Sequence, residues 1–325
     1  MRRMVIIGYD GAELLDIACP ADVFDTAAWF GARPGYRVEF VSLGGRPVRC
    51  SNGLALAAAP LEAVRGPLDT VLAAGGLGHT GAAADARVLT HLRRLAGLSR
   101  RVASVCTGAT LLAAAGLLDG RRATTHWMFA AELAQRYPAV EVDPAPLYVR
   151  DGNVLTSAGV TSALDLSLAM VEDDHGPELS RAVARSLVTY LQRPGNQAQV
   201  SMFLAAPPPE HETVRKVMAH IADRPGDDLG SAALARLAGV SARHLTRLFR
   251  DQLGTTPARH VRAVRAETAA HLLVSTRLPL DAVARRCGFG CTETLRQAFA
   301  ERYATSPSAY RRAHRASAGT LRAAG

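Results

Sequence analysis

Short hydrophobic runs recur along the first half of the chain. Four of them are four to six residues long and end near Gly, Ser or Asp, at Met4–Tyr9, Val38–Leu43, Thr70–Ala74 and Val102–Val105. Apolar runs of this length without polar alternation are typical of parallel strands that are buried on both faces. We therefore predict that these segments are strands of one parallel sheet.

Helix-length segments separate these runs. Apolar residues recur at helical spacing over residues 14–29, 86–98 and 109–118. The alternation of strands and helices predicts an α/β domain with a doubly wound sheet, whose ligand site lies at the carboxyl ends of the strands. The residues that fall at these ends are Asp10, Gly75, Gly76 and Cys106.

The last third of the chain has a purely helical pattern. Residues 213–224 place their apolar side chains on one helical face. A short helix follows, for which Ser231 can be the cap and Gly239 the end, and Ser241 can cap the next helix. A helix, a glycine turn and a second helix are the signature of a helix-turn-helix unit.

The same unit occurs a second time over residues 280–303, with Asp281 near the start of its first helix and Gly288 at its turn. A long helix over residues 258–275, opened by Pro257, is expected to join the two units. At ~1.5 Å per residue it spans about 27 Å, close to the ~34 Å between successive major-groove faces of DNA. Two recognition helices at this spacing can read adjacent turns of double-stranded DNA.

Each unit ends in a helix with one apolar and one polar face. In the first, Leu245, Leu248 and Phe249 are expected inside, and the outward residues proposed to contact DNA are Arg243, Thr246, Arg247 and Arg250, beside His244. In the second, Leu295, Ala298 and Phe299 are expected inside, and the outward residues are Thr292, Glu293, Arg296 and Gln297. Since Arg paired with guanine is the commonest specific contact in the major groove, we expect Arg247 to read a base.

The charge of the chain is strongly segregated. Residues 1–209 carry 19 basic and 19 acidic side chains, whereas residues 210–325 carry 19 and 10, so the second part holds the whole net charge of +9. A basic domain joined to a neutral domain is typical of a nucleic-acid-binding protein with a second function.

Composition excludes several other classes of protein. The 325 residues suffice for two domains with hydrophobic cores, and no apolar run approaches the ~20 residues of a membrane-spanning helix. Because the N-terminus lacks the apolar core of a secretory signal, we expect a soluble cytoplasmic protein. In that compartment the five cysteines stay reduced, and none belongs to a disulfide framework.

Cys106 stands where a buried strand turns directly into a helix opened by Thr107. This strand–turn–helix arrangement is that of a nucleophile elbow, and the helix N-terminus is expected to favour the thiolate and lower the pKa of the thiol. A structural buried cysteine is the alternative, because no histidine follows Cys106 to act as a base.

The segments GAELLDIACPADVF, SVCTGATLLAAAGLLDGRRATTHW and VLTSAGVTSALDLSLAMVEDDHG, within residues 4 to about 200, resemble the ThiJ/PfpI-type domain of GlxA-type regulators. The resemblance implies a flavodoxin-like sandwich with Cys106 on the elbow. By the pattern of isonitrile hydratase, an enzyme of this superfamily, Asp16 faces the thiol and Thr107 lies beside it. The two groups are then expected to share a proton. His126 can approach this pocket or be a core histidine.

The segment from about residue 213 to 312 resembles the AraC/XylS DNA-binding domain, on the GFG sequence before Cys291, Phe299 and the SPSAYR sequence. Cys291 departs from that family, which often has serine or alanine there. Cys287 and Cys291 are four residues apart, but no further ligands follow at metal-binding spacing, so core and cap positions are expected and no metal or cofactor is predicted.

Together these patterns predict a transcription regulator. An α/β sensor domain over residues 1–205, which binds a small-molecule effector and dimerises, is joined by a Pro-rich linker over residues 206–212 to an AraC-type domain over residues 213–312, followed by a flexible tail over residues 313–325. Two alternatives are a thiol-dependent enzyme of the isonitrile hydratase type that uses Cys106 and Asp16, and a non-specific nucleoid or RNA-binding protein.

Overall fold

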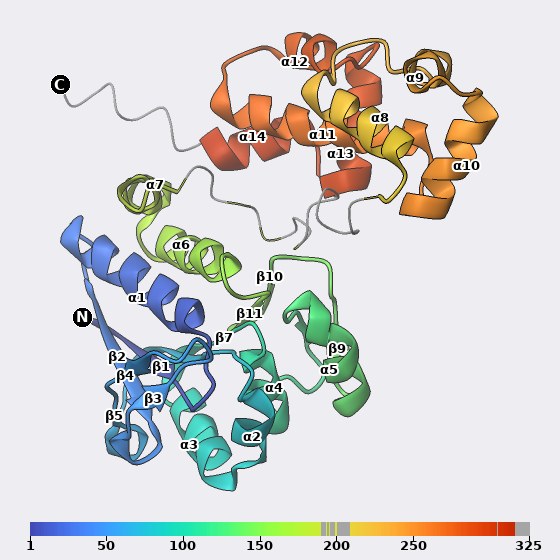
Figure 1. Ribbon diagram of the computed structural model, residues 1–325. Helices are drawn as coiled ribbons and strands as arrows, with labels where there is room; N and C mark the ends of the chain where they lie inside the picture. The colour runs from blue at the N-terminus through green and yellow to red at the C-terminus, as the bar shows by residue number, and fades with distance from the viewer. Residues whose placement is uncertain (190–192, 194, 196–198, 200–208, 304, 316–325) are drawn as a thin grey trace, which may run out of the picture. The chain divides into compact units, whose positions relative to one another are not determined.

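The computed structural model describes residues 1–189, 193, 195, 199, 209–303 and 305–315 (Figure 1). The chain divides into two compact units, Met1–Gln199 and Val200–Gly325. Residues 206–208 of the expected linker and residues 316–325 of the expected tail lie outside the described residues.

The first unit is built on a seven-stranded sheet with the order β10-β11-β7-β6-β1-β2-β5. Its strands are β1 (Arg2–Ile7), β2 (Tyr36–Ser42), β5 (Ala59–Pro60), β6 (Leu68–Ala73), β7 (Ser99–Val105), β10 (Tyr148–Asp151) and β11 (Val154–Ser157). All neighbouring pairs are parallel except β10 with β11. The prediction of a doubly wound, mostly parallel sheet is confirmed.

Helices cover both faces of this sheet (Figure 1). One face carries α1 (Leu14–Trp29), α6 (Ser162–His175) and α7 (Pro177–Ser186), and the other carries α2 (His79–Ala84), α3 (Ala86–Ala96) and α4 (Gly108–Ala114). In β1, Met4 and Ile6 enter the first core, and Val5 and Ile7 enter the second. Burial of alternate residues on opposite faces explains why this strand is an unbroken apolar run.

Smaller elements complete the first unit. They are β3 (Val48–Arg49), β4 (Ala55–Leu56), β8 (Arg122–Ala123), β9 (Glu141–Val142), α5 (Ala130–Arg136) and the 3-10 turns η1 (Leu43–Gly45), η2 (Leu61–Ala63) and η3 (Trp127–Phe129). The strands begin up to three residues before their apolar runs, because polar residues at their ends also belong to the sheet. Arg2 in β1 is an example, and it pairs with Asp69 at 2.8 Å. The helix expected over 109–118 is shorter, since Gly116 at φ 72° follows its last turn.

The regular elements among the described residues of the second unit are all helices. Its helices are α8 (Glu212–Asp223), α9 (Ser231–Ala238), α10 (Ala242–Leu253), α11 (Pro257–Ser275), α12 (Leu280–Arg286), α13 (Thr292–Tyr303) and α14 (Pro307–Arg315). One core packs α8, α9 and α10 against Val261 and Val264 of α11, and a second packs α12, α13 and α14 against Ala266 and Ala269 of the same helix. The long central helix thus joins two helix-turn-helix units. The expected domain end at 312 falls inside α14.

The two caps expected in the first helix-turn-helix differ in outcome. Ser241 caps α10 as predicted, since its hydroxyl oxygen accepts the His244 N–H at 3.2 Å. The cap expected at Ser231 is wrong: Gly230 precedes α9 in extended conformation, and Ser231 is the first helical residue. No helix among the described residues combines the length and apolar character needed to cross a bilayer.

Candidate functional site

Cys106 lies on a sharp turn between β7 and α4. Its φ of 54° is in the left-handed region, which costs a non-glycine residue about 1–3 kcal/mol and persists only where the surroundings enforce it. Here the Cys106 N–H donates to the carbonyl of Ser157 at 2.9 Å, and the Thr125 hydroxyl donates to the Cys106 carbonyl at 2.8 Å. The turn is therefore held on both sides by neighbouring segments.

Two glycines allow the chain to close around Cys106. A Cβ atom at Gly75 would lie 2.6 Å from the Cβ atom of Cys106 and 2.7 Å from a carboxylate oxygen of Asp16. At Gly159, which has a φ of 96°, a Cβ atom would lie 2.2 Å from that of Cys106. Any side chain at either position would displace the thiol, so the predicted neighbour Gly75 has a steric role.

Asp16, in the first turn of α1, is fully buried beside the thiol. One carboxylate oxygen accepts the Val160 N–H at 2.7 Å and the other accepts the Gly75 N–H at 3.2 Å. Burial, opposed by these hydrogen bonds, raises the pKa of Asp16 to about 7. The Cys106 thiol also hydrogen-bonds this carboxyl group.

The expectation of a thiolate at Cys106 is not met. Burial, followed by the negative charge of Asp16, raises the pKa of Cys106 to about 12, and hydrogen bonds from Thr107 offset this only in part. The short helix end supplies too little stabilisation to outweigh desolvation. The raised pKa values of Cys106 and Asp16 agree with the expectation that the two groups hold a proton between them.

Thr107 and Gly76 are brought together on the other side of the thiol. The Thr107 hydroxyl donates to the Gly76 carbonyl at 2.9 Å and accepts the Gly76 N–H at 2.8 Å. His126 instead caps η3, where its Nδ1 accepts the Met128 N–H at 3.3 Å and its ring stacks on Trp127. Its neighbour Thr125 is the residue that contacts Cys106.

Two polar side chains of the first unit were missed by sequence reasoning. The Tyr9 hydroxyl donates to the Ala74 carbonyl at 2.9 Å, and burial, with the charges of Asp16 and Cys106, raises the pKa of Tyr9. His79 is buried, lies 3.1 Å from the Thr110 hydroxyl, and has its pKa lowered by burial. Tyr9 is the last residue of a predicted strand, and this position at a strand end was the available signal. His79 had no such signal, because its contact with Thr110 of α4 forms only in the folded unit.

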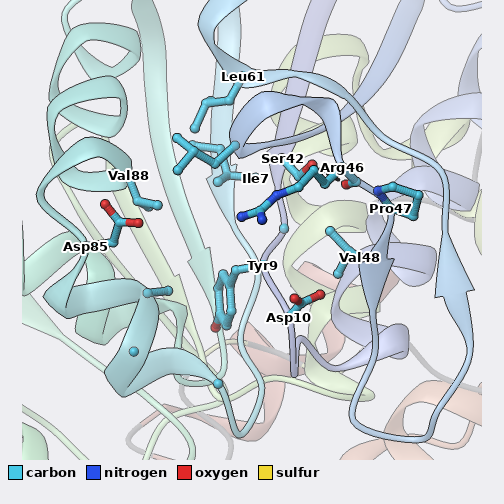
Figure 2. A pocket seen from close by; sticks show the side chains of 15 residues that line it. Ile7, Tyr9, Asp10, Ser42, Arg46, Pro47, Val48, Leu61, Asp85 and Val88 are labelled. Atoms are coloured by element: carbon cyan, nitrogen blue, oxygen red, sulfur yellow. Dashed lines mark hydrogen bonds between the residues drawn. The ribbon is translucent and has the colours of Figure 1, made fainter.

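Beyond Tyr9, a pocket of about 270 Å³ opens at the carboxyl ends of β1 and β2 (Figure 2). This is the edge of the sheet where the sequence predicted a ligand site. Asp10 lines it, as does Arg46, which the sequence did not single out. The rest of the lining includes Ile7, Ser42, Val48, Leu61, Asp85 and Val88.

Arg193 and Gln199, which follow α7 in the sequence, bind the loops that hold the Cys106 site. Arg193 pairs with the buried carboxylate of Asp165 at 2.6 Å and donates to the Thr161 hydroxyl at 3.0 Å. Gln199 donates to the Thr125 carbonyl at 2.8 Å. Thr161 adjoins the residue whose N–H binds Asp16, and Thr125 binds the Cys106 carbonyl, so each anchor is one or two residues from the thiol–carboxyl pair.

In the second unit, α10 and α13 place their predicted apolar residues inward. Leu245 and Phe249 are buried in α10, as are Leu295, Ala298 and Phe299 in α13, whereas Leu248 is half-buried. The proposed DNA-contacting residues differ in exposure. Arg243, Arg247, Arg250, Glu293, Arg296 and Gln297 are exposed, and Thr246 and Thr292 are half-buried.

The two recognition faces differ in charge. No ion pair among the described residues involves Arg243, Arg247 or Arg250, and Arg247 instead lies 3.0 Å from a ring nitrogen of His244. On α13, Arg296 pairs with Glu293 at 3.3 Å. The Thr246 hydroxyl is turned back to the Ala242 carbonyl. The first face therefore presents unneutralised cations, and the second presents a donor beside an acceptor.

Residues 1–173 match the DJ-1/PfpI family, and residues 234–313 match a helix-turn-helix domain family. The HTH-type transcriptional regulator GlxA of Rhizobium meliloti (strain 1021) is 32% identical over 303 residues, or 92% of each chain. This chain belongs to the DJ-1/PfpI family. A crystal structure of an AraC family transcriptional regulator from Pseudomonas putida has a TM-score of 0.51 and 26% identity over 57% of this chain and 100% of that one.

These findings confirm the prediction of a DJ-1/PfpI domain joined to an AraC-type helix-turn-helix domain, and with it that of a DNA-binding transcription regulator. One relative has the name of an enzyme. Isonitrile hydratase of Pseudomonas putida is 34% identical over 175 residues, which are 54% of this chain and 73% of that enzyme. The comparisons thus favour a regulator and keep thiol chemistry as the alternative.

Proposed function

We propose that this DJ-1/PfpI regulator reads specific DNA sequences through α10 and α13 and senses a small metabolite through its α/β unit. The observation that carries the first part is the presence of two helix-turn-helix units on the segment that holds the whole net charge of +9. A basic surface supplies affinity for phosphate, and the polar outer faces of the two helices supply sequence readout.

The DNA-contacting residues that we propose are Arg243, Thr246, Arg247 and Arg250 on α10, and Thr292, Glu293, Arg296 and Gln297 on α13. Free guanidinium groups on α10 suit guanine and phosphate. The Glu293–Arg296 pair on α13 suits a cytosine beside a guanine, because the carboxylate can accept from cytosine and the guanidinium can donate to guanine.

The sensing part of the proposal uses the α/β unit. Asp16, Gly75, Gly76, Cys106 and Thr107 form a buried polar centre beside the pocket at β1 and β2. Arg193 and Gln199 hydrogen-bond Thr161 and Thr125 in the loops that hold this centre. Both residues follow α7, in the part of the sequence that leads to the DNA-binding unit. We place the protein in the cytoplasm as a homodimer, in which two copies bind a doubled site.

A thiol-dependent hydratase is the second candidate function, and the adjacent Cys106 and Asp16 favour it. An Asp16 pKa of about 7 suits proton transfer near neutral pH, but a Cys106 pKa of about 12 leaves almost no thiolate there. Mass spectrometry for the formamide produced from an isonitrile and water tests this candidate. Formamide produced by the intact chain and abolished by Cys106→Ala would establish the enzyme, and its absence would leave the regulator.

Titration of labelled duplex DNA with two fragments tests the main proposal. Residues 210–325 should bind with an affinity that falls steeply as salt rises, because counterion release drives the binding. The fragment of residues 1–205, which has no net charge, should not bind the duplex. Salt-independent or absent binding by the basic fragment would refute the proposal, provided that its helical circular dichroism is intact.

A further inference from the structure

We propose that the pocket over β1 and β2 binds a small organic monocarboxylate, with Arg46 pairing with its carboxylate group. This inference rests on the proposed sensing function and names the chemical class of its ligand. The pocket volume of about 270 Å³ is below the roughly 300–1,000 Å³ of drug-sized sites, so it suits a small metabolite.

Most polar groups of the pocket already have partners. Asp85 accepts the Arg87 N–H at 2.9 Å and pairs with the Arg87 guanidinium at 2.8 Å, which lowers the pKa of Asp85 to about 2. The Ser42 hydroxyl donates to the Arg46 carbonyl. The hydroxyl of Tyr9 donates to a backbone carbonyl. The two hydroxyl donors are therefore already used, and the Asp85 carboxylate is already paired with a cation.

The Arg46 guanidinium is different. Among the described residues no ion pair or hydrogen bond to it is found, and Figure 2 shows it turned toward the space surrounded by Ile7, Tyr9 and Val88. A planar guanidinium fork matches a carboxylate in a two-point contact. The Arg46 side chain is exposed, so water reaches this pairing, and the two-point geometry favours a carboxylate here more than burial does.

The remaining lining defines the rest of the ligand. The wall formed by Ile7, Leu61 and Val88 suits an apolar body. Asp10 lines the pocket too, and its Oδ1 accepts the Arg49 N–H at 3.0 Å. Its negative charge disfavours a second carboxylate, which is why the proposal is a monocarboxylate.

Tyr9 links this pocket to the buried centre. It lines the pocket, and its electrostatic neighbours include Asp16 and Cys106. A ligand that packs against Tyr9 is therefore separated from Asp16 and Cys106 by a single side chain. The loops around these two residues are the ones that bind Arg193 and Gln199.

Calorimetric titration of the full chain with benzoate and isovalerate, at millimolar concentrations, tests the proposal. Three comparison probes differ in charge: neutral benzamide, the dicarboxylate phthalate and the cation benzylamine. At least one monocarboxylate should bind, and all three comparison probes should bind more weakly by about tenfold or more. No binding of either monocarboxylate, or equal binding of benzoate and benzamide, would overturn the proposal.

Three variants locate the site. Arg46→Gln removes the charge, and Gly81→Leu fills the pocket, because a Cβ atom at Gly81 in α2 meets nothing within 4 Å. Both should weaken binding about tenfold or more, whereas Arg49→Gln, three residues further on in β3 and outside the lining, should not. Equal loss in Arg46→Gln and Arg49→Gln would overturn the assignment. DNA binding by the same variants reports separately on the regulator function, which survives if only the pocket assignment fails.

Discussion

At the scale of single residues, Cys106 and Asp16 decide how the buried centre behaves. Because the pKa of Cys106 is about 12, iodoacetamide should label this thiol very slowly near pH 8. Cys291 is exposed, and backbone hydrogen bonds from Thr294 and Glu293 lower its pKa, so it should be labelled first. Peptide mass spectrometry over a time course in the intact chain distinguishes the two sites.

Removal of the carboxylate supplies the control. Asp16→Asn should speed labelling of Cys106, because the negative charge that disfavours the thiolate is gone, and should leave Cys291 unchanged. Labelling of Cys106 ahead of Cys291 in the unaltered chain would show that the elbow does stabilise a thiolate.

The raised pKa of Asp16 also predicts how stability depends on pH. Folding raises this pKa from about 3.9 to about 7, so the folded state binds the proton more tightly. The resulting stabilisation is complete below pH about 4 and is lost as the pH rises through 7, a change of roughly 4 kcal/mol. Asp16→Asn should remove this part of the pH dependence.

Urea unfolding followed by tryptophan fluorescence measures this effect in the full chain, because both tryptophans, Trp29 and Trp127, are in the first unit. The difference between the unaltered chain and the variant should change with pH between 4 and 7. A difference that is constant over this range would mean that Asp16 titrates normally.

The sequence could place Cys106, Gly75 and Gly76 at strand ends, but not the environment of the thiol. The N–H that binds Asp16 most closely comes from Val160, 144 positions along the chain, and no local pattern encodes such a pairing. The direction of the Cys106 pKa shift depended on burial and on this carboxyl group. A helix N-terminus considered alone therefore predicted the wrong sign.

At the scale of secondary-structure elements, the prediction that is easiest to refute concerns α10. Arg247→Ala should cost about 1–3 kcal/mol at the cognate site and relax the preference at one base pair, with little effect on non-specific binding. Binding to matched and single-base-changed duplexes over a salt series measures both effects. Equal losses on every sequence, with a salt slope smaller by about one, would assign Arg247 to a phosphate.

The elements themselves were largely predictable. Parallel strands buried on both faces are long apolar runs, and α1 occupies the 14–29 segment that helical spacing indicated. The antiparallel strand β10 was missed, because four residues with two polar positions, YVRD, carry no clear strand signal. The two-residue strands β3 and β4 depend on pairing with each other, which the local sequence does not show.

At the scale of the whole molecule, we expect Arg193 and Gln199 to couple the centre of Asp16 and Cys106 to the part of the chain that leads to the DNA-binding unit. Asp16→Asn offers one acceptor oxygen to two backbone donors, Val160 and Gly75, so one hydrogen bond is lost. The adjoining Thr161 turn should loosen, and the amide of Arg193 should exchange with deuterium about tenfold faster.

Thr107→Val is the matched control for this coupling. It alters the same buried centre, but its hydroxyl hydrogen-bonds Gly76 and the Cys106 thiol and not a residue of either anchored loop. Exchange at Arg193 should stay unchanged in this variant. Equal acceleration by both substitutions would indicate general loosening of the unit and not a path through the anchors.

Two helix-turn-helix units of one chain are proposed to read two adjacent turns of DNA. Selection of binding sequences from a random duplex library with the whole chain tests this proposal. Two enriched blocks are expected for each bound chain, with centres about 10 base pairs apart, one of them altered in Arg247→Ala and the other in Arg296→Ala. A single enriched block, or no enrichment despite salt-dependent binding, would contradict it.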